Sequence, residues 1–118
     1  MKARTKGRLA EFLARCLFRL QGYKIVSANC RGQKGTGIGE VDFIAKRQNV
    51  MVFVEVKQRS SIENAAYSVK VEQQKRIWRA AETFLQKHPA FQTCEVRFDT
   101  VLISLPFKMR HIKDAFRF

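Results

Sequence analysis

The sequence predicts an α/β protein with helices and strands in the order αβββαβ. Its 118 residues fit a single domain, residues 1–118. A hydrophobic share of 46% can form a core without disulfides. Apolar residues recur with helical spacing near the N-terminus and again in residues 67–87, and β-prone segments lie between and after these two stretches.

The first helix is expected around residues 9–20 and ends at Gly22. Its apolar residues recur every three or four positions: Leu9, Phe12, Leu13, Cys16, Leu17 and Leu20. A strand is predicted from Tyr23 to Asn29. Four glycines within residues 32–39 then indicate a mobile, partly basic loop, which lacks the GxGxxG and Gly-Lys-Ser/Thr patterns of a phosphate-binding loop.

Two further strands are predicted from Glu40 to Arg47 and from Val50 to Arg59, with a turn at Gln48 and Asn49. A loop follows at residues 60–66. These two strands form a hairpin that carries the charged residues discussed below.

The second helix is expected from Tyr67 to Lys87, because His88-Pro89 ends it. Its apolar stripe includes Val71, Ile77, Trp78, Ala81, Phe84 and Leu85. A last long strand runs from Glu95 to Leu105 and is closed by Pro106. Residues 107–118 are expected to form a short strand and a terminal turn or helix.

The charge balance indicates a polyanionic partner. The chain has 23 Lys and Arg against 10 Asp and Glu, a net charge of +13, and residues 1–34 alone hold nine basic residues and one acid. Nucleic acid is the first candidate, with DNA favoured over RNA. A basic soluble protein without this partner is the alternative that charge alone leaves open.

The three cysteines, Cys16, Cys30 and Cys94, are far apart and form no CxxC pair, so neither a zinc site nor a disulfide is expected. No apolar run approaches membrane-spanning length, and charged residues interrupt the N-terminal segment. We therefore expect no membrane association and a cytoplasmic location.

The hairpin places charged side chains in its most β-prone part. Side chains alternate across a strand, so Glu55 and Lys57 share a face with Phe53, opposite Val52, Val54 and Val56. A turn at Gln48-Asn49 pairs residues whose numbers sum to 97, so Asp42 lies opposite Glu55. Directly opposed carboxylates repel each other, and a bound divalent cation would reverse that cost.

This pattern suits metal-assisted phosphodiester hydrolysis. Asp42, Glu55 and the backbone carbonyl of Val56 are oxygen ligands of the kind that Mg²⁺ or Mn²⁺ takes. Lys57, two residues after Glu55, would orient the attacking water or stabilise developing charge on the phosphate. The alternative is a solvated face with Glu40 and Lys57 as a surface ion pair.

Several other residues have two interpretations each. Glu11 either pairs with Arg15 one helical turn away or serves as a third metal-site acid. Gln74, near the start of the second helix, either positions water or phosphate or marks the end of the core-facing stripe. Trp78 is expected in the core, with base stacking as the alternative. Asp99 is expected to be a structural, hydrogen-bonded acid. The residues predicted to contact nucleic acid are Arg31, Lys34, Arg59, Lys70, Gln74, Lys75 and Arg79.

Nearly the whole chain, from Gly7 to Phe116, resembles the small bacterial YraN-like family of uncharacterised proteins (UPF0102). The matching segments are GRLAEFLARCLFRLQG, ANCR, GEVDFIA, FVEVKQR, RFDTV and IKDAF. This family lies in the restriction-endonuclease-like, or PD-(D/E)xK, superfamily and is similar to archaeal Holliday-junction resolvases. The sequence departs from the family at Gln73, where lysine is common, and in a longer glycine-rich loop.

The resemblance implies a restriction-endonuclease-like αβββαβ core with a central mixed sheet flanked by helices. It also implies a metal site at Asp42, Glu55 and Lys57, with Glu11 as an additional acid. Two functions follow from these observations: a Mg²⁺- or Mn²⁺-dependent DNA endonuclease acting on branched DNA among other substrates, or a nucleic-acid-binding module that keeps the fold without catalysis. Resolvase-like cleavage of two strands would favour a homodimer.

Overall fold

A computed structural model describes residues 3–30, 41–59, 69–104 and 108–117, with side chains described from residue 8 onward except at 29 and 30. The predicted order αβββαβ is confirmed, and a fifth strand follows it. The elements are α1 (Ala3–Leu20), β1 (Lys24–Cys30), β2 (Val41–Arg47), β3 (Val50–Gln58), α2 (Val71–Lys87), a 3₁₀ turn (Pro89–Phe91), β4 (Glu95–Ser104) and β5 (Lys108–Ile112). The predicted glycine-rich loop and residues 105–107, which include Pro106, lie outside the described residues.

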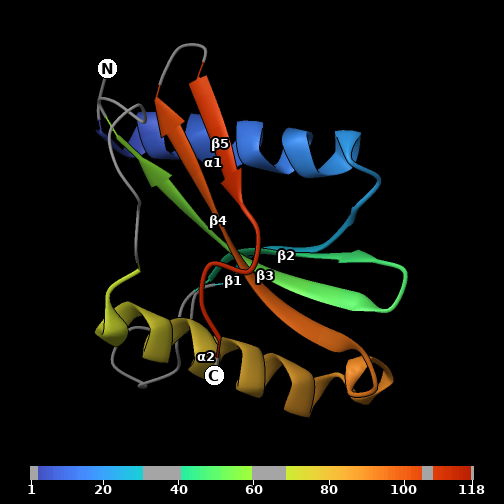
Figure 1. Ribbon diagram of the computed structural model, residues 1–118. Coiled ribbons are helices and arrows are strands. Elements are labelled where there is room, and N and C mark those ends of the chain that lie inside the picture. The colour runs from blue at the N-terminus through green and yellow to red at the C-terminus, as the bar shows by residue number, and fades with distance from the viewer. Residues whose placement is uncertain (1–2, 31–40, 60–68, 105–107, 118) are drawn as a thin grey trace.

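The five strands form one mixed sheet in the order β1-β2-β3-β4-β5. Strands β3 and β4 are parallel, and every other neighbouring pair is antiparallel. A parallel pair needs a crossover connection, which α2 supplies here. Helices α1 and α2 cover opposite faces of the sheet (Figure 1). The predicted class, a central mixed sheet flanked by helices, is therefore confirmed.

Each face of the sheet has its own apolar core. On the α1 side, Phe18 packs with Phe43 and Val54, and on the α2 side, Ile77 packs with Ile44 and Phe53. Phe43 and Ile44 are consecutive and face opposite helices, as the alternation of side chains along a strand requires. On β3 and β4 the same alternation gives the face of each residue, whereas on β2 it fails before Phe43, because Val41 packs on the α2 side and Phe43 on the α1 side.

Helix α1 packs through a narrower stripe than its sequence suggests. Its buried residues are Ala10, Ala14 and Phe18, at intervals of four, whereas Phe12 is 47% exposed and Leu20 is 86% exposed. Two alanines let the helix backbone approach the sheet closely. Several of the predicted apolar residues therefore lie outside the core.

Helix α2 also differs from its prediction. It begins at Val71, and Lys70 before it has an extended backbone (φ −63°, ψ 145°). Ile77 and Ala81 of the predicted stripe are buried, but Trp78 is 39% exposed. The expectation that Trp78 belongs to the core is wrong, because the helix turns its smaller apolar residues toward the sheet.

The turns agree with the sequence prediction. Gly22 has φ +91°, a conformation that favours glycine, and it follows the last turn of α1. Gln48 in the β2–β3 turn has φ +54°. The five described β2–β3 pairs run from Arg47–Val50 to Phe43–Val54, and the two residue numbers of each pair sum to the predicted 97.

Among the described residues, no helix is long and apolar enough to span a membrane.

Candidate active site

Glu55, near the end of β3, is held by two donors. Its Oε1 lies 2.9 Å from Nζ of Lys57 and accepts a 2.7 Å hydrogen bond from Nε2 of Gln73, which belongs to the first turn of α2. Glu55 is 9% exposed. The strand and the helix thus fix the position of one nearly buried carboxylate.

Asp42 on β2 is the second acid of this region, and it is 8% exposed. Its Oδ2 accepts a 2.7 Å hydrogen bond from the backbone N–H of Val56, the residue after Glu55. The described ladder ends at Phe43–Val54, so the Asp42 carboxylate reaches β3 directly beyond the last described backbone pair. The register brings Asp42 and Glu55 to adjacent positions on neighbouring strands.

The Glu55 carboxylate faces α2. Phe53, two residues before Glu55, packs in the α2-side core. The hydrogen bond from Gln73 confirms this direction for Glu55. Glu55, Lys57 and Gln73 therefore form a small polar cluster where the sheet meets the start of α2, and Asp42 is tied to the backbone of Val56 beside it.

Thr100 adds an unusual feature beside this cluster. It is the register partner of Glu55 on the parallel strand β4 and lies two residues from Phe98 of the α2-side core, so its side chain shares the face of Glu55. Thr100 is fully buried, and its Oγ1 has no hydrogen-bond partner among the residues that the structure describes. Buried hydroxyls are almost always paired, so this atom stands out.

The donor set fits a hard divalent cation. Two carboxylates on adjacent strands and the Val56 carbonyl supply oxygen atoms, which Mg²⁺ and Mn²⁺ prefer. The unpartnered Thr100 hydroxyl is a further polar oxygen beside Glu55. The residues present are thus compatible with the metal that the sequence pattern suggests.

Glu11 is not gathered with the other two acids. Among the described residues, no three His, Cys, Asp or Glu side chains form a group that could hold a metal. Glu11 is half-buried on α1, which packs on the face of the sheet opposite α2. A direct ligand role for Glu11 has no geometric support in this arrangement.

The predicted nucleic-acid contacts have mixed outcomes. Arg31 and Lys34 lie outside the described residues. Gln74 does not point to the site, because its amide donates a 2.8 Å hydrogen bond to the Val69 carbonyl, and the neighbouring Gln73 reaches Glu55 instead. The remaining four predicted contacts are exposed: Arg59, Lys70, Lys75 and Arg79.

Sequence reasoning missed Gln73 and Thr100 as site residues. Gln73 was recognisable only as a departure from the lysine that is common in the family. Threonine is ordinary in β-strands, so no sequence signal distinguishes Thr100.

A second polar cluster surrounds Asp99 on β4 and has a structural role, as predicted. Both carboxylate oxygens accept 2.8 Å hydrogen bonds from Arg97, while Nε2 of His111 lies 2.7 Å from Oδ2 and the backbone N–H of Asp114 donates to Oδ1. Burial alone would raise the pKa of Asp99, but the hydrogen bonds from His111, Arg97 and Asp114 and the charge of Arg97 outweigh it and lower that pKa. The hydrogen bond to Asp99 in turn raises the pKa of Arg97.

The fold defines the class of this protein: it is an α/β protein with a central five-stranded mixed sheet flanked by two helices. A solved structure from Archaeoglobus fulgidus, described as Hjc, a Holliday junction resolvase, aligns over 87% of this chain and 72% of its own chain, with a TM-score of 0.53 and 14% sequence identity. At this identity the likeness concerns the fold alone.

The chain belongs to the Uncharacterised protein family UPF0102, whose sequence model matches residues 10–103. The UPF0102 protein amb4503 of Paramagnetospirillum magneticum is 43% identical over 116 residues, which cover 98% of this chain and 89% of that protein. A UPF0102 protein of Nitrobacter winogradskyi is 41% identical over 110 residues, covering 93% of this chain and 90% of that protein.

Proposed function

We propose that this protein is a divalent-metal-dependent nuclease that hydrolyses phosphodiester bonds in DNA, including branched DNA. The observation that carries the proposal is the salt bridge of 2.9 Å between Glu55 and Lys57, with Asp42 of the neighbouring strand accepting a hydrogen bond from the backbone of Val56, the residue between them. The nuclease fold of the structural neighbour and the net charge of +13 support it.

Each residue has a role in this proposal. Asp42 and Glu55 would hold Mg²⁺ or Mn²⁺, together with the Val56 carbonyl, and the ion would polarise the phosphate and its water. The Lys57 ammonium would then leave Glu55 and contact the attacking water or the phosphate. Gln73 is a positioning residue, since it fixes Glu55 from α2.

Cleavage of two strands of a junction needs two such sites, so the proposal includes a homodimer. Sedimentation with and without a four-way junction measures the assembly. The exposed side chains of Lys70, Lys75 and Arg79 on and before α2 would hold the phosphate backbone.

The first prediction concerns cleavage. Glu55→Ala and Lys57→Ala should each reduce Mn²⁺-dependent nicking by at least about 100-fold, within the range for losing a general acid–base group or a charge-stabilising group. DNA binding in EDTA should change less than about threefold, since exposed phosphate contacts remain. A nicking assay on linear, flap and four-way DNA measures the first effect, and fluorescence anisotropy measures the second.

Glu72→Ala is the matched control, because it removes an exposed carboxylate next to Gln73 on α2. It should cleave like the wild type. Equal cleavage by highly purified wild type and a Glu55→Ala, Lys57→Ala double variant would reject the nuclease proposal.

One observation favours a non-catalytic nucleic-acid-binding module as the second candidate. Lys57 forms an ion pair with Glu55, and Gln73 donates a hydrogen bond to the same carboxylate oxygen, so the protein itself neutralises and holds this group. Calorimetric titration of Mn²⁺ into wild type and Asp42→Asn separates the two functions. A nuclease should bind the ion in the wild type and lose most of that binding in Asp42→Asn, whereas a binding module should give no metal signal in either protein.

A further inference from the structure

Trp78 is the single tryptophan of the chain, and it is 39% exposed on the middle of α2. A single exposed apolar side chain is normal on a protein surface. The informative feature is that Trp78 lines a cavity. The polar cluster around Glu55 does not include Trp78.

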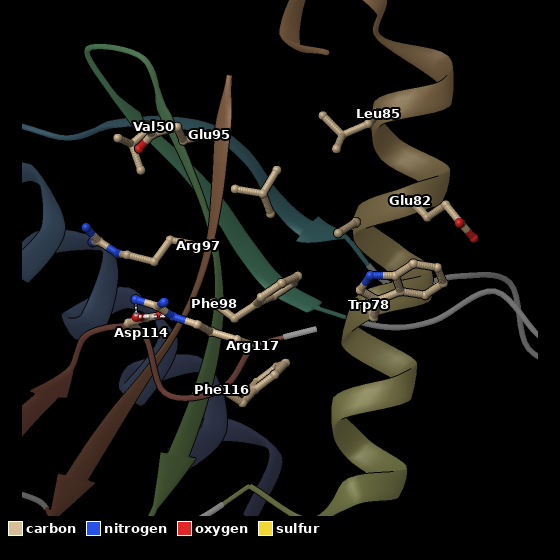
Figure 2. Close-up of a pocket in the computed structure, with 12 residues that line it drawn as sticks. Val50, Trp78, Glu82, Leu85, Glu95, Arg97, Phe98, Asp114, Phe116 and Arg117 are labelled. Carbon is tan, nitrogen blue, oxygen red and sulfur yellow. Dashed lines mark hydrogen bonds and ion pairs between the residues drawn. The ribbon is translucent and has the colours of Figure 1, made fainter. Parts of the chain in front are cut away.

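Trp78 lines a cavity of about 590 Å³ between α2, the start of β4 and the C-terminal segment (Figure 2). Figure 2 shows Phe98 and Phe116 on the wall across from Trp78, and these two rings stack with centroids 4.9 Å apart and planes 16° apart. The other apolar lining residues are Val50, Ala81, Leu85 and Val96. Small-molecule sites are usually cavities of about 300–1,000 Å³ lined in this way, so a flat ring of nucleobase size fits.

The charges of the cavity exclude a phosphate from its interior. Both cations in its lining are already paired, Arg97 with Asp99 and Arg117 with Asp114. Glu82 and Glu95 add negative charge at its margin. An uncharged flat group is therefore favoured inside the cavity over an anion.

Cations that suit a phosphate lie just outside. Lys75 and Arg79 are exposed on α2, three residues before Trp78 and one residue after it. Residues three apart on a helix are neighbours on its surface. A nucleotide can thus place its base against Trp78 while its phosphate contacts Lys75.

The α2 side of the cavity lies on the same face of the sheet as Glu55, because Phe98 and Leu85 pack in the α2-side core, whereas Val50 packs on the α1 side. Trp78 follows Gln73, the partner of Glu55, by five residues along α2, a rise of about 8 Å. This rise corresponds to about two base-pair steps along the axis of B-form DNA.

We propose that this cavity binds an unpaired nucleobase of the substrate, stacked on Trp78, a few nucleotides from the phosphate held at Glu55. The inference rests on the proposed function in taking nucleic acid as the ligand. It names the substrate class, which is DNA with unstacked bases beside the cleavage site, such as flaps, loops and junctions. A base inside a continuous duplex cannot enter the cavity without leaving the stack.

The fluorescence of the single tryptophan tests this directly, in EDTA so that no cleavage occurs. A single-stranded oligonucleotide of about 12 nucleotides should quench Trp78 saturably. An abasic oligonucleotide of equal length and charge should bind by anisotropy without quenching. A blunt duplex should also bind with little quenching.

Substitutions provide the second arm. Trp78→Ala should weaken single-strand binding by about five- to 100-fold, the loss expected for one base–aromatic stack, and leave duplex binding within about twofold. Val71→Ala, at a 63% exposed position on the same helix outside the cavity, is the matched control and should change neither. Trp78→Phe should retain part of the affinity if Trp78→Ala does not fold.

Equal quenching by the abasic strand, or unchanged single-strand affinity of a folded Trp78→Ala, overturns the proposal. Quenching by an arginine-rich aromatic peptide and not by DNA also overturns it, in favour of a protein partner. Cleavage activity without quenching rejects this inference alone. If DNA quenches Trp78 in the wild type but the wild type does not cleave DNA, the nuclease proposal alone is rejected.

Discussion

At the scale of single residues, the buried Asp99 links stability to pH. Its pKa is lowered below the ordinary 3.8, so the native state favours the ionised carboxylate. This stabilisation is complete above pH 3.8 and is lost as the pH falls through the lower pKa of the native state. Asp99 ties β4 to the chain after β5 through His111 and the backbone of Asp114, so its ionisation helps to hold the sheet edge in place.

Asp99→Asn should therefore lower the free energy of unfolding at pH 7 by about 3 kcal/mol, because Arg97 and His111 lose a buried charged partner. The difference from the wild type should shrink at about pH 3. Urea unfolding at the two pH values measures both effects. Asp114→Asn is the control: its partner Arg117 is exposed, so a change below about 1 kcal/mol is expected. A pH-independent difference would show that the charge of Asp99 does not stabilise the fold.

Thr100 allows an unusual prediction, since removing its hydroxyl should stabilise the protein. Its Oγ1 is buried and no described residue forms a hydrogen bond with it, which costs free energy in the native state. Thr100→Val has nearly the same shape and should raise the free energy of unfolding by about 1 kcal/mol in metal-free buffer. Thr100→Ser keeps the hydroxyl, loses a methyl group and should destabilise by about 1 kcal/mol. A less stable Thr100→Val, measured by urea unfolding, would show that the hydroxyl is paired.

At the scale of elements, the hairpin was the most predictable part of the molecule. Its register follows from a two-residue turn at Gln48-Asn49 and from alternation, because a slip of one residue would turn the valines of β3 from the α1-side core to the other face of the sheet. The adjacent positions of Asp42 and Glu55 on the two strands could therefore be predicted from the sequence. The hydrogen bond from Val56 to Asp42 could not, because it forms where the regular ladder ends.

The helices were less predictable, since each presents apolar residues over more than one face. Helix α1 buries Ala10 and Ala14 while Phe12 stays largely exposed, and α2 buries Ile77 while Trp78 lines a cavity. Spacing identifies an amphipathic helix, but the side that packs depends on how closely its backbone approaches the sheet. For the same reason Gln73, rather than Gln74, reaches Glu55.

At the scale of the whole molecule, the large positive charge governs the strength of nucleic-acid binding. Exposed Lys and Arg side chains neutralise phosphates and release counterions, so affinity should fall linearly on a plot of log K against log salt. In this proposal, the exposed cations of α2 contact the phosphates. Both cations that line the base cavity are paired with acids. Salt dependence and base stacking are therefore separable properties of one surface.

The last prediction tests this separation. Replacing Lys75 and Arg79 with alanine should reduce the magnitude of the salt slope for duplex DNA by about 2, one for each lost phosphate contact. Anisotropy titrations at several salt concentrations measure the slope. The double variant Arg110→Ala, Lys113→Ala removes the same charge from exposed positions on and after β5, so it controls for net charge. If both variants change the slope equally, binding follows the total charge and α2 is not the surface that tracks the DNA backbone.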